Sequence, residues 1–454
     1  MILTLHDDNR PWSDNIERAD IGILDWQVAK HQLRAVFSDH RVIATLGSLE
    51  IVAAPGAEYA LPKVHERLGS FIHDLGNSIP DCWMGAKHAV QNLRHIQNEP
   101  KNDALNGIWN GTTICIASGP SNAKYLEKIR QIQNQCIIVI ADSMWKGCRA
   151  AGIDPHFVCV LERDPLLASL VPPDSKSRAR LVVPAVAYPP TVDGWGGRRV
   201  WWWQQFTDLY RWIAPDIDQH PTGRSAGTMA CALSVLLGSR RVYLVGHDLS
   251  RGPDGSSHSA HVDTLASTNH GAASQRREPL HEDIVIDGKR TCRFWNFARG
   301  DIETLHADNP DIMRILGNDG LDIPGMARES EIELVNPQEY VAGTLKVSPS
   351  RAPIDLKAIV KADMDSFARY APKIQAASET PNLESIARAT NMIDPNVWGH
   401  VKVADLYKYI LGPAYRAASL RGHLRCHMPG SHAAAFRVLL RAIPSTLAMM
   451  DRDL

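Results

Sequence analysis

The sequence predicts an α/β protein whose central domain is a parallel sheet with helices on both faces. Three observations support this prediction. Apolar runs of strand length alternate with helical stretches from 112 to about 345, a polar segment of linker composition at 98–111 precedes them, and helical patterning dominates from Leu356 onward. At about 150 residues per domain, 454 residues suggest three domains. We place an N-terminal α+β domain at 1–105, the parallel-sheet domain at 106–345 and a C-terminal helical domain at 346–454.

The two flanking blocks are predicted from short patterns. The first block mixes strand-like pieces at Val42–Leu46 and Leu49–Ala53 with helical ones at His65–Ile79 and Ala86–Ile96. The last block follows two prolines in Ser348–Pro353, and its pattern suits a small helical bundle. The helices expected there are Leu356–Tyr370, Pro381–Met392, Asp405–Leu420 and His432–Asp451.

The middle block carries the clearest strand pattern. Its apolar runs are short, and a helical stretch at Ser225–Gly238 separates the last two of them. Strand, helix and strand at this spacing indicate parallel pairing, in which ligands bind beyond the carboxyl ends of the strands. The expected strands are Thr112–Ala117, Cys136–Ala141, His156–Leu161, Leu181–Ala187, Val200–Gln205 and Arg241–Val245.

Composition narrows the class of protein. Lys and Arg number 49 and Asp and Glu 50, so a formal net charge of −1 argues against a nucleic-acid partner or a polybasic membrane binder. No apolar run approaches the roughly 20 residues that a membrane span needs, and Met1 to Arg10 does not resemble a signal peptide. The eight cysteines form no Cys-x-x-Cys pair, and several lie in apolar runs as small hydrophobes. We therefore expect a cytoplasmic, reduced protein.

Four polar turns follow the predicted strands. They are Ser118–Ser121, Asp142-Ser143, Glu162–Asp164 and Gly246–Asp248. Because the carboxyl ends of parallel strands share one edge of a sheet, we expect these turns to converge on one pocket.

The first turn has the composition of an anion-binding loop. Gly119 permits close approach of a ligand, Pro120 presets the first helical turn, and Ser121 and its neighbours would offer free N–H groups at the positive end of a helix. An ordinary tight turn is the alternative. The sequence is neither G-x-G-x-x-G nor a P-loop, so it is no evidence for either site.

A second helix begins at Ser225-Ala226-Gly227-Thr228. Its small residues would let a phosphate or ribose approach closely. The simpler interpretation is that Ser225 caps a buried helix, and the two roles are compatible.

Histidines crowd the segment after the last strand. His247, His258, His261, His270 and His281 match no zinc-binding spacing, so a single histidine acting as acid or base is favoured over a metal site. Asp248 would orient such a histidine or bind ribose hydroxyls. Residues 252–257 look flexible, which would place His258 on a loop that closes over substrate.

Three parts of the chain together resemble a known family. They are TTICIASGPS (112–121) with IADSMWKGCRAAGIDPHFVCVLERD (140–164), SAGTMACALSVLLGSRRVYLVGHDLSRGPDGSSHSAH (225–261), and VIDGKRTCRFWNFARGDIE (285–303) with ILGNDGLDIPGM (315–326). The combination resembles the motility-associated factor (Maf) glycosyltransferases, whose central domain is similar to the hydroxymethylpterin diphosphokinase MptE. The same blocks are similar to bacterial sialyltransferases that use CMP-sialic acid. The resemblance covers about 112–330 and implies a Rossmann-like nucleotide-sugar transferase domain.

The resemblance also implies roles for individual residues. Ser118, Gly119, Pro120 and Ser121 would hold the donor phosphate and ribose, while Asp142, Ser143 and Glu162 would line the nucleotide pocket. Ser225, Gly227 and Thr228 would lie beside the sugar carboxylate, and Gly246, Asp248 and His258 would belong to the catalytic rim. Ser250 and His258 stand where the sialyltransferases place tyrosines against the phosphate. His258, His270 and His281 compete for the position of the catalytic base.

The activity expected from this resemblance is transfer of a nonulosonic acid, such as pseudaminic, legionaminic or sialic acid, from a CMP-activated donor to Ser or Thr of flagellin or another surface protein. Backbone N–H groups and helix dipoles can stabilise the leaving phosphate, so no metal cofactor is expected. An inverting displacement with histidine as base is the simplest mechanism.

Two alternatives remain. One is pyrophosphoryl transfer from ATP to a pterin alcohol, with Mg²⁺ held by Asp142, Glu162 and Asp248. The other is a non-catalytic module that keeps the nucleotide-binding fold.

Overall fold

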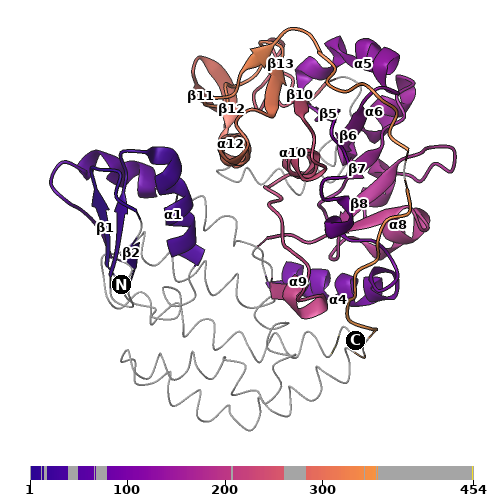
Figure 1. Cartoon of the computed structure of the whole chain (residues 1–454), viewed down its shortest axis with the longest axis horizontal. Coiled ribbons are helices and arrows are strands. Elements are labelled where there is room, and N and C mark those ends of the chain that lie inside the picture. The colour runs from indigo at the N-terminus through magenta and orange to yellow at the C-terminus, as the bar shows by residue number, and fades with distance from the viewer. Residues whose placement is uncertain are drawn as a thin grey trace. The chain divides into compact units, whose positions relative to one another are not determined.

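The computed structural model describes residues 2–11, 13–14, 18–38, 50–65, 67, 79–205, 208–259, 283–341, 343–353, 355 and 452. Contacts divide the chain into two compact units, drawn in Figure 1. One consists of Met1–Lys87, Phe206–Trp212 and Ile354–Leu454, and the other of His88–Gln205 and Ile213–Pro353. The four helices predicted between 356 and 451, the strand predicted at 42–46 and most of the helix predicted at 65–79 lie outside the described residues.

The described part of the first unit is a small mixed sheet with a helix. Its strand order is β2-β3-β1-β4, in which β1 runs parallel to β3 and β4 while β2 runs antiparallel to β3. Leu3, Leu5 and Ile21 from the sheet and Leu33 from the helix share one core. The bounds are β1 Ile2–His6, β2 Ser13–Asp14, β3 Arg18–Gly22, α1 Trp26–Ser38, β4 Glu50–Ala53 and η1 Glu58–Ala60.

The second unit contains an eight-stranded sheet of order β14-β13-β10-β5-β6-β7-β8-β9. Every pairing between neighbours in this sheet is parallel. The predicted fold class and all six predicted central strands are confirmed, whereas β13 and β14 were not predicted. The strands are β5 Thr112–Ile116, β6 Ile137–Ala141, β7 Phe157–Cys159, β8 Arg180–Pro184, β9 Arg199–Trp202, β10 Arg241–Val245, β13 Met313–Leu316 and β14 Arg328–Glu329.

Helices cover both faces of this sheet, as the sequence predicts. In Figure 1, α5 (Leu126–Ile132) and α6 (Trp145–Ala150) lie on one face, and α10 (Ala226–Leu236) and α12 (Arg293–Asp308) on the other. The remaining elements are α4 Ile79–Ile96, η2 Asn102–Leu105, η3 Pro120–Lys124, η4 Asp142–Met144, α7 Leu167–Leu170, α8 Pro189–Gly194, α9 Asp208–Ile213 and the antiparallel hairpin β11 Asp283–Ile286 and β12 Lys289–Cys292. Within the described ranges, no helix combines the length and apolarity needed to cross a bilayer.

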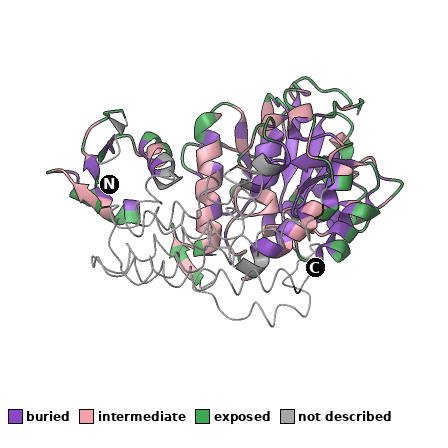
Figure 2. Ribbon diagram, turned by 90° about the horizontal axis from the view of Figure 1, so that it is seen from below, coloured by how far each residue is buried: buried purple, intermediate pink, exposed green. Residues whose placement is uncertain are grey.

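The core of the second unit explains why these strands form. β6 reads IIVIA and is buried throughout, as expected for a strand covered on both faces. In α10, residues 228–234 are all buried, so this helix is apolar on every side rather than amphipathic. Figure 2 shows the buried residues concentrated in the sheet. α10 and the strands that it contacts, β5, β6, β7 and β10, therefore share one core.

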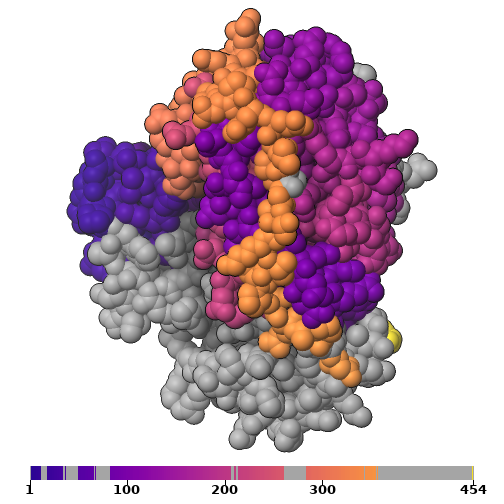
Figure 3. Space-filling model, turned by 45° about the vertical axis from the view of Figure 1, so that its right-hand side comes forward, coloured from indigo at the N-terminus to yellow at the C-terminus, as the bar shows by residue number. Residues whose placement is uncertain are grey.

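The polar segment 98–111 is part of this core and not a linker, which corrects the interpretation of its composition. Lys101 and Leu105 are fully buried. The Lys101 ammonium donates to the carbonyl oxygens of Ile96 (2.8 Å) and Ser348 (2.7 Å). Ser348 belongs to the extended stretch that follows β14 and crosses the surface of the unit (Figure 3, orange). The Asn and Gly content of this segment suggests an exposed linker, but main-chain carbonyls satisfy the buried Lys101 ammonium and allow the segment to join the core.

Candidate functional site

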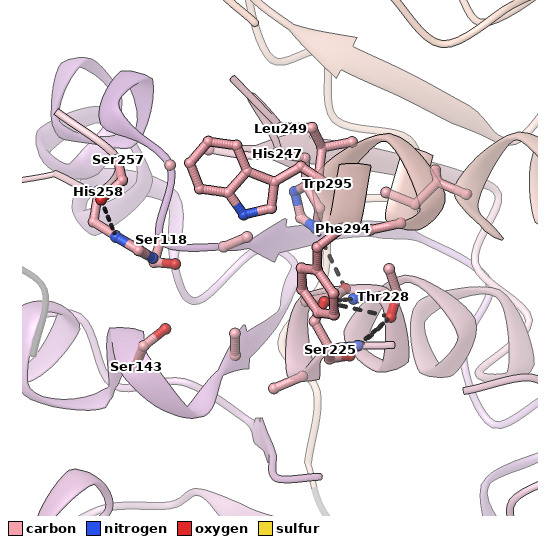
Figure 4. Close-up of a pocket in the computed structure, with 18 of the residues that line it drawn as sticks. Ser118, Ser143, Ser225, Thr228, His247, Leu249, Ser257, His258, Phe294 and Trp295 are labelled. Carbon is pink, nitrogen blue, oxygen red and sulfur yellow. Dashed lines mark hydrogen bonds between the residues drawn. The ribbon is translucent and has the colours of Figure 1, made fainter. Parts of the chain in front are cut away.

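A pocket lies at the carboxyl ends of β5, β6 and β10 (Figure 4). β5 pairs with β6 on one side and with β10 on the other, so the chain changes direction across the sheet at this point. Such a switch point leaves a crevice between the loops that diverge from neighbouring strands. The lining comes from the turns after three strands, from the starts of two helices and from one further loop. These residues are 117–119 after β5, 141–143 after β6, 225–228 at the start of α10, Gly246, His247, Leu249 and Ser250 after β10, Ser257 and His258, and Phe294, Trp295, Ala298 and Ile302 of α12.

Ten of the fourteen residues that the resemblance assigns to the site line this pocket. They are Ser118, Gly119, Asp142, Ser143, Ser225, Gly227, Thr228, Gly246, Ser250 and His258. The expectation that polar turns far apart in the chain gather at one edge is met for three of the four turns. Pro120, Ser121, Glu162 and Asp248 are not among the lining residues. His270 and His281 lie outside the described residues.

The loop after β5 is fastened to the loop after β10. The N–H of Gly119 donates to the carbonyl oxygen of Gly246 (2.8 Å), and the N–H of Ser121 donates to the carboxylate of buried Asp248 (2.8 Å). This corrects the expectation that the Ser121 N–H is free for a ligand. Asp248 therefore holds the loop after β5 in place without lining the pocket, while Gly246, His247, Leu249 and Ser250 beside it do line the pocket.

The start of α10 presents a capped helix end to the pocket. The Ser225 hydroxyl accepts from the N–H of Thr228 (3.2 Å), and the Thr228 hydroxyl accepts from the N–H of Ser225 (3.0 Å). The prediction that Ser225 caps this helix is confirmed. Ala226 and Gly227 in the first turn also line the pocket, at the positive end of an 11-residue helix. That end favours an anion.

Asp142 supplies a carboxyl group that holds its proton up to neutral pH. It begins η4, is buried, and accepts from the N–H of Ser143 (2.7 Å). Burial raises the pKa of Asp142 to about 7; the Ser143 hydrogen bond opposes this shift and the negative charge of Glu162 adds to it. Below that pH Asp142 is a neutral hydrogen-bond donor, which does not repel a phosphate.

His258 lies at the opposite rim, close to Ser118 (Figure 4). Its Nδ1 is 2.9 Å from the Ser257 hydroxyl oxygen, and the N–H of Ser259 donates to the carbonyl oxygen of Ser118 (3.0 Å). Burial lowers the pKa of His258, and the positive charge of Arg251 lowers it further. The imidazole is therefore neutral at pH 7 and able to accept a proton.

Two aromatic side chains that the sequence analysis missed stand over the pocket. Phe294 and Trp295 belong to the first turn of α12, and both are half-buried. The Arg251 guanidinium lies 5.8 Å from the centre of the Trp295 ring. Figure 4 shows Trp295 between His258 and Phe294. The available signal was the cluster RFWNF at a helix start, and such rings provide a stacking surface for a planar base.

His247, which belongs to the predicted turn Gly246–Asp248, also lines the pocket, and it contacts two buried thiols that the sequence did not connect with it. Its Nε2 lies 3.3 Å from Cys231 Sγ and 3.8 Å from Cys115 Sγ. Burial would raise the pKa of Cys115, but the Cys231 hydrogen bond and the His247 charge outweigh burial and lower that pKa. Metal ions in proteins are commonly bound by His, Cys, Asp and Glu side chains. Among the residues that the structure describes, Cys115, Cys231 and His247 are the one group of three such side chains whose ligand atoms lie close enough together to hold an ion. Asp142, Glu162 and Asp248 form no such group.

Comparisons with known proteins agree with the resemblance seen in the sequence. Residues 87–253 match the family described as 6-hydroxymethylpterin diphosphokinase MptE-like. The fold is similar to that of a Maf glycosyltransferase from Magnetospirillum magneticum AMB-1, with a TM-score of 0.52 and 15% sequence identity over 96% of this chain and 71% of that chain. A comparison with curated proteins gave no match. The match at this identity establishes the Rossmann-like α/β fold, as the sequence predicts.

Proposed function

We propose that this chain is a glycosyltransferase that moves a nonulosonic acid from a CMP-activated donor to a hydroxyl group. The observation that carries the proposal is the pocket at the β5–β10 switch point, which combines a helix start, an aromatic surface and a neutral histidine. The fold that the chain shares with a Maf glycosyltransferase supports the same class of reaction.

Each part of the pocket has a task in this proposal. Phe294 and Trp295 stack on the cytosine, and the first turn of α10 at Ala226 and Gly227 receives an anionic group of the donor. The bond from the anomeric carbon to the phosphate oxygen breaks, and the CMP phosphate leaves with the electron pair. His258 takes the proton of the attacking hydroxyl. We propose no metal for this step, because N–H groups and the helix dipole stabilise the leaving charge.

The acceptor is proposed from the resemblance alone. Ser or Thr hydroxyls of flagellin or another surface protein would attack the sugar, and the parts of the chain outside the second unit would bind that protein. The sugar itself would be of the pseudaminic, legionaminic or sialic type.

Metal-free binding of cytidine nucleotides is the first expected result. CMP and CDP should raise the melting temperature by a few degrees without Mg²⁺, since a ligand at a hundred times its Kd stabilises by about 2.7 kcal/mol. AMP carries the same phosphate on another base and is the matched control. Equal stabilisation by AMP and CMP, or none by either, would contradict a cytidylate donor.

The match of 87–253 to the MptE-like family favours a second candidate, pyrophosphoryl transfer from ATP to a pterin alcohol. It requires Mg²⁺ and carboxylate ligands, but Asp248 is already bound to the Ser121 N–H. The same thermal measurements should include ATP and pterin, each with and without Mg²⁺. Stabilisation by ATP only with Mg²⁺ would replace our proposal by this one, and no response to any nucleotide would favour a non-catalytic module.

The role of His258 is tested separately. We expect His258→Ala to keep its thermal shift with CMP and to lose transfer by about 100-fold or more, because the acceptor proton then has no base. Lys128→Ala, an exposed side chain of α5 in the second unit that does not line the pocket, is the control and should leave transfer unchanged. Unchanged turnover in His258→Ala would move the role to His270 or His281.

A further inference from the structure

Three soft donor atoms meet beneath the pocket, and each comes from a different element. Cys115 lies on β5, Cys231 on α10, and His247 directly after β10. Both cysteines are fully buried and His247 is 7% exposed. The two sulfur atoms are 3.9 Å apart, and His247 Nε2 is 3.3 Å from Cys231 Sγ and 3.8 Å from Cys115 Sγ. The proposed transfer reaction uses none of these atoms.

Their spacing fits one metal geometry. A tetrahedral zinc ion with Zn–S near 2.3 Å and Zn–N near 2.05 Å requires an S–S separation of about 3.8 Å and S–N separations of about 3.6 Å. The three observed distances agree with these values to within about 0.3 Å. The donors therefore already have the spacing that the ion would impose.

The charges also fit. Two thiolates balance a divalent ion, and imidazole adds no charge, so the complete group is neutral within an apolar core. Without an ion, His247 Nε2 lies near three polar atoms, namely the two sulfur atoms and the Gly227 carbonyl oxygen at 3.4 Å. In either ring tautomer Nε2 makes one good hydrogen bond, whereas an ion would contact both sulfur atoms and the nitrogen together.

We propose that Cys115, Cys231 and His247 bind a zinc ion that ties β5, α10 and the loop after β10 together under the pocket. Thiolate and imidazole donors select zinc over Mg²⁺ or Ca²⁺. With zinc on Nε2, the ring proton would lie on Nδ1, a buried atom to which none of the described residues offers a hydrogen-bond partner. Three protein ligands leave one position of a tetrahedral ion for a water molecule. This inference does not depend on the proposed transfer reaction.

Metal content of the full-length protein tests it. After purification without chelators, elemental analysis should find close to one zinc per chain. Replacement of zinc by Co²⁺ should give the intense absorption of tetrahedral cobalt–thiolate bonds. If the folded wild-type protein takes up neither metal after incubation with excess zinc or cobalt, or if Cys115 and Cys231 join as a disulfide instead, the proposal is wrong.

A matched pair of variants assigns the ligands. Cys231→Ser should lose the cobalt–thiolate band and nearly all of the zinc. Cys159→Ser changes another fully buried cysteine of the same core and should keep both. Circular dichroism identifies variants that fail to fold, and the wild-type measurement stands without them. Equal zinc content in two folded variants would overturn the assignment.

Discussion

Replacement of Asp142 by asparagine is expected to stabilise the protein at pH 8 and to change its stability little at pH 4. Burial raises the pKa of Asp142 from 3.8 to about 7. Ionisation of this group therefore costs more free energy in the folded protein than in the unfolded chain. Asparagine has the same shape, cannot ionise, and still accepts the Ser143 N–H bond. We expect a gain of about 3 kcal/mol in the free energy of unfolding at pH 8.

The direction of the pH dependence follows from the two pKa values. Between pH 3.8 and about 7, the unfolded chain has released the Asp142 proton while the folded chain keeps it. The stability linked to this proton is fully present below pH 3.8 and is lost as the pH rises through about 7. Wild-type protein should therefore lose more stability between pH 4 and 8 than Asp142→Asn.

Urea unfolding at pH 4, 6 and 8 measures this difference. Asp311→Asn removes an exposed aspartate and should follow the wild-type curve at each pH. CMP affinity offers a second measurement, since an ionised Asp142 would repel the phosphate above pH 7 and asparagine would not. A gain that is equal at pH 4 and pH 8 would show that Asp142 does not hold its proton in the folded protein.

Sequence patterns were sufficient for the part of the fold that follows from local rules. The run CIIVIA is too short and too apolar for anything but a buried strand, and β6 begins one residue after its Cys136. Once parallel pairing was accepted, the turns at Gly119, Asp142 and Gly246 had to share one edge of the sheet. The pocket could therefore be predicted without knowing any contact distance.

What the sequence did not reveal depends on contacts between distant segments. Cys115 and Cys231 are 116 residues apart, and each alone is only a small buried hydrophobe. The spacing of His247 from the other histidines after β10 predicts no metal site, because the sulfur atoms that it contacts lie on α10 and β5. The strand pattern places the turn of Asp248 at the sheet edge and the resemblance implies a place at the catalytic rim, but nothing local indicates that its carboxylate binds the Ser121 N–H.

The largest loss of stability is expected from Gly119→Ala. Gly119 has an extended backbone that any residue can adopt, so its requirement is space rather than conformation. A Cβ there would lie 2.4 Å from the Gly246 carbonyl oxygen and 2.5 Å from an Asp248 carboxylate oxygen. Both oxygens are fixed, because one accepts the N–H of Gly119 itself and the other accepts the N–H of Ser121.

Relieving this clash requires breaking the two hydrogen bonds that join the β5 and β10 loops. We expect a decrease of about 3 kcal/mol or more in the free energy of unfolding, together with loss of the CMP thermal shift. Gly300→Ala is the matched control, since no atom lies within 4 Å of its added Cβ in α12, and it should gain about 0.5–1 kcal/mol. Urea unfolding measures both variants. If Gly119→Ala unfolds at the wild-type midpoint and still binds CMP, the contact between these loops does not hold the pocket in shape.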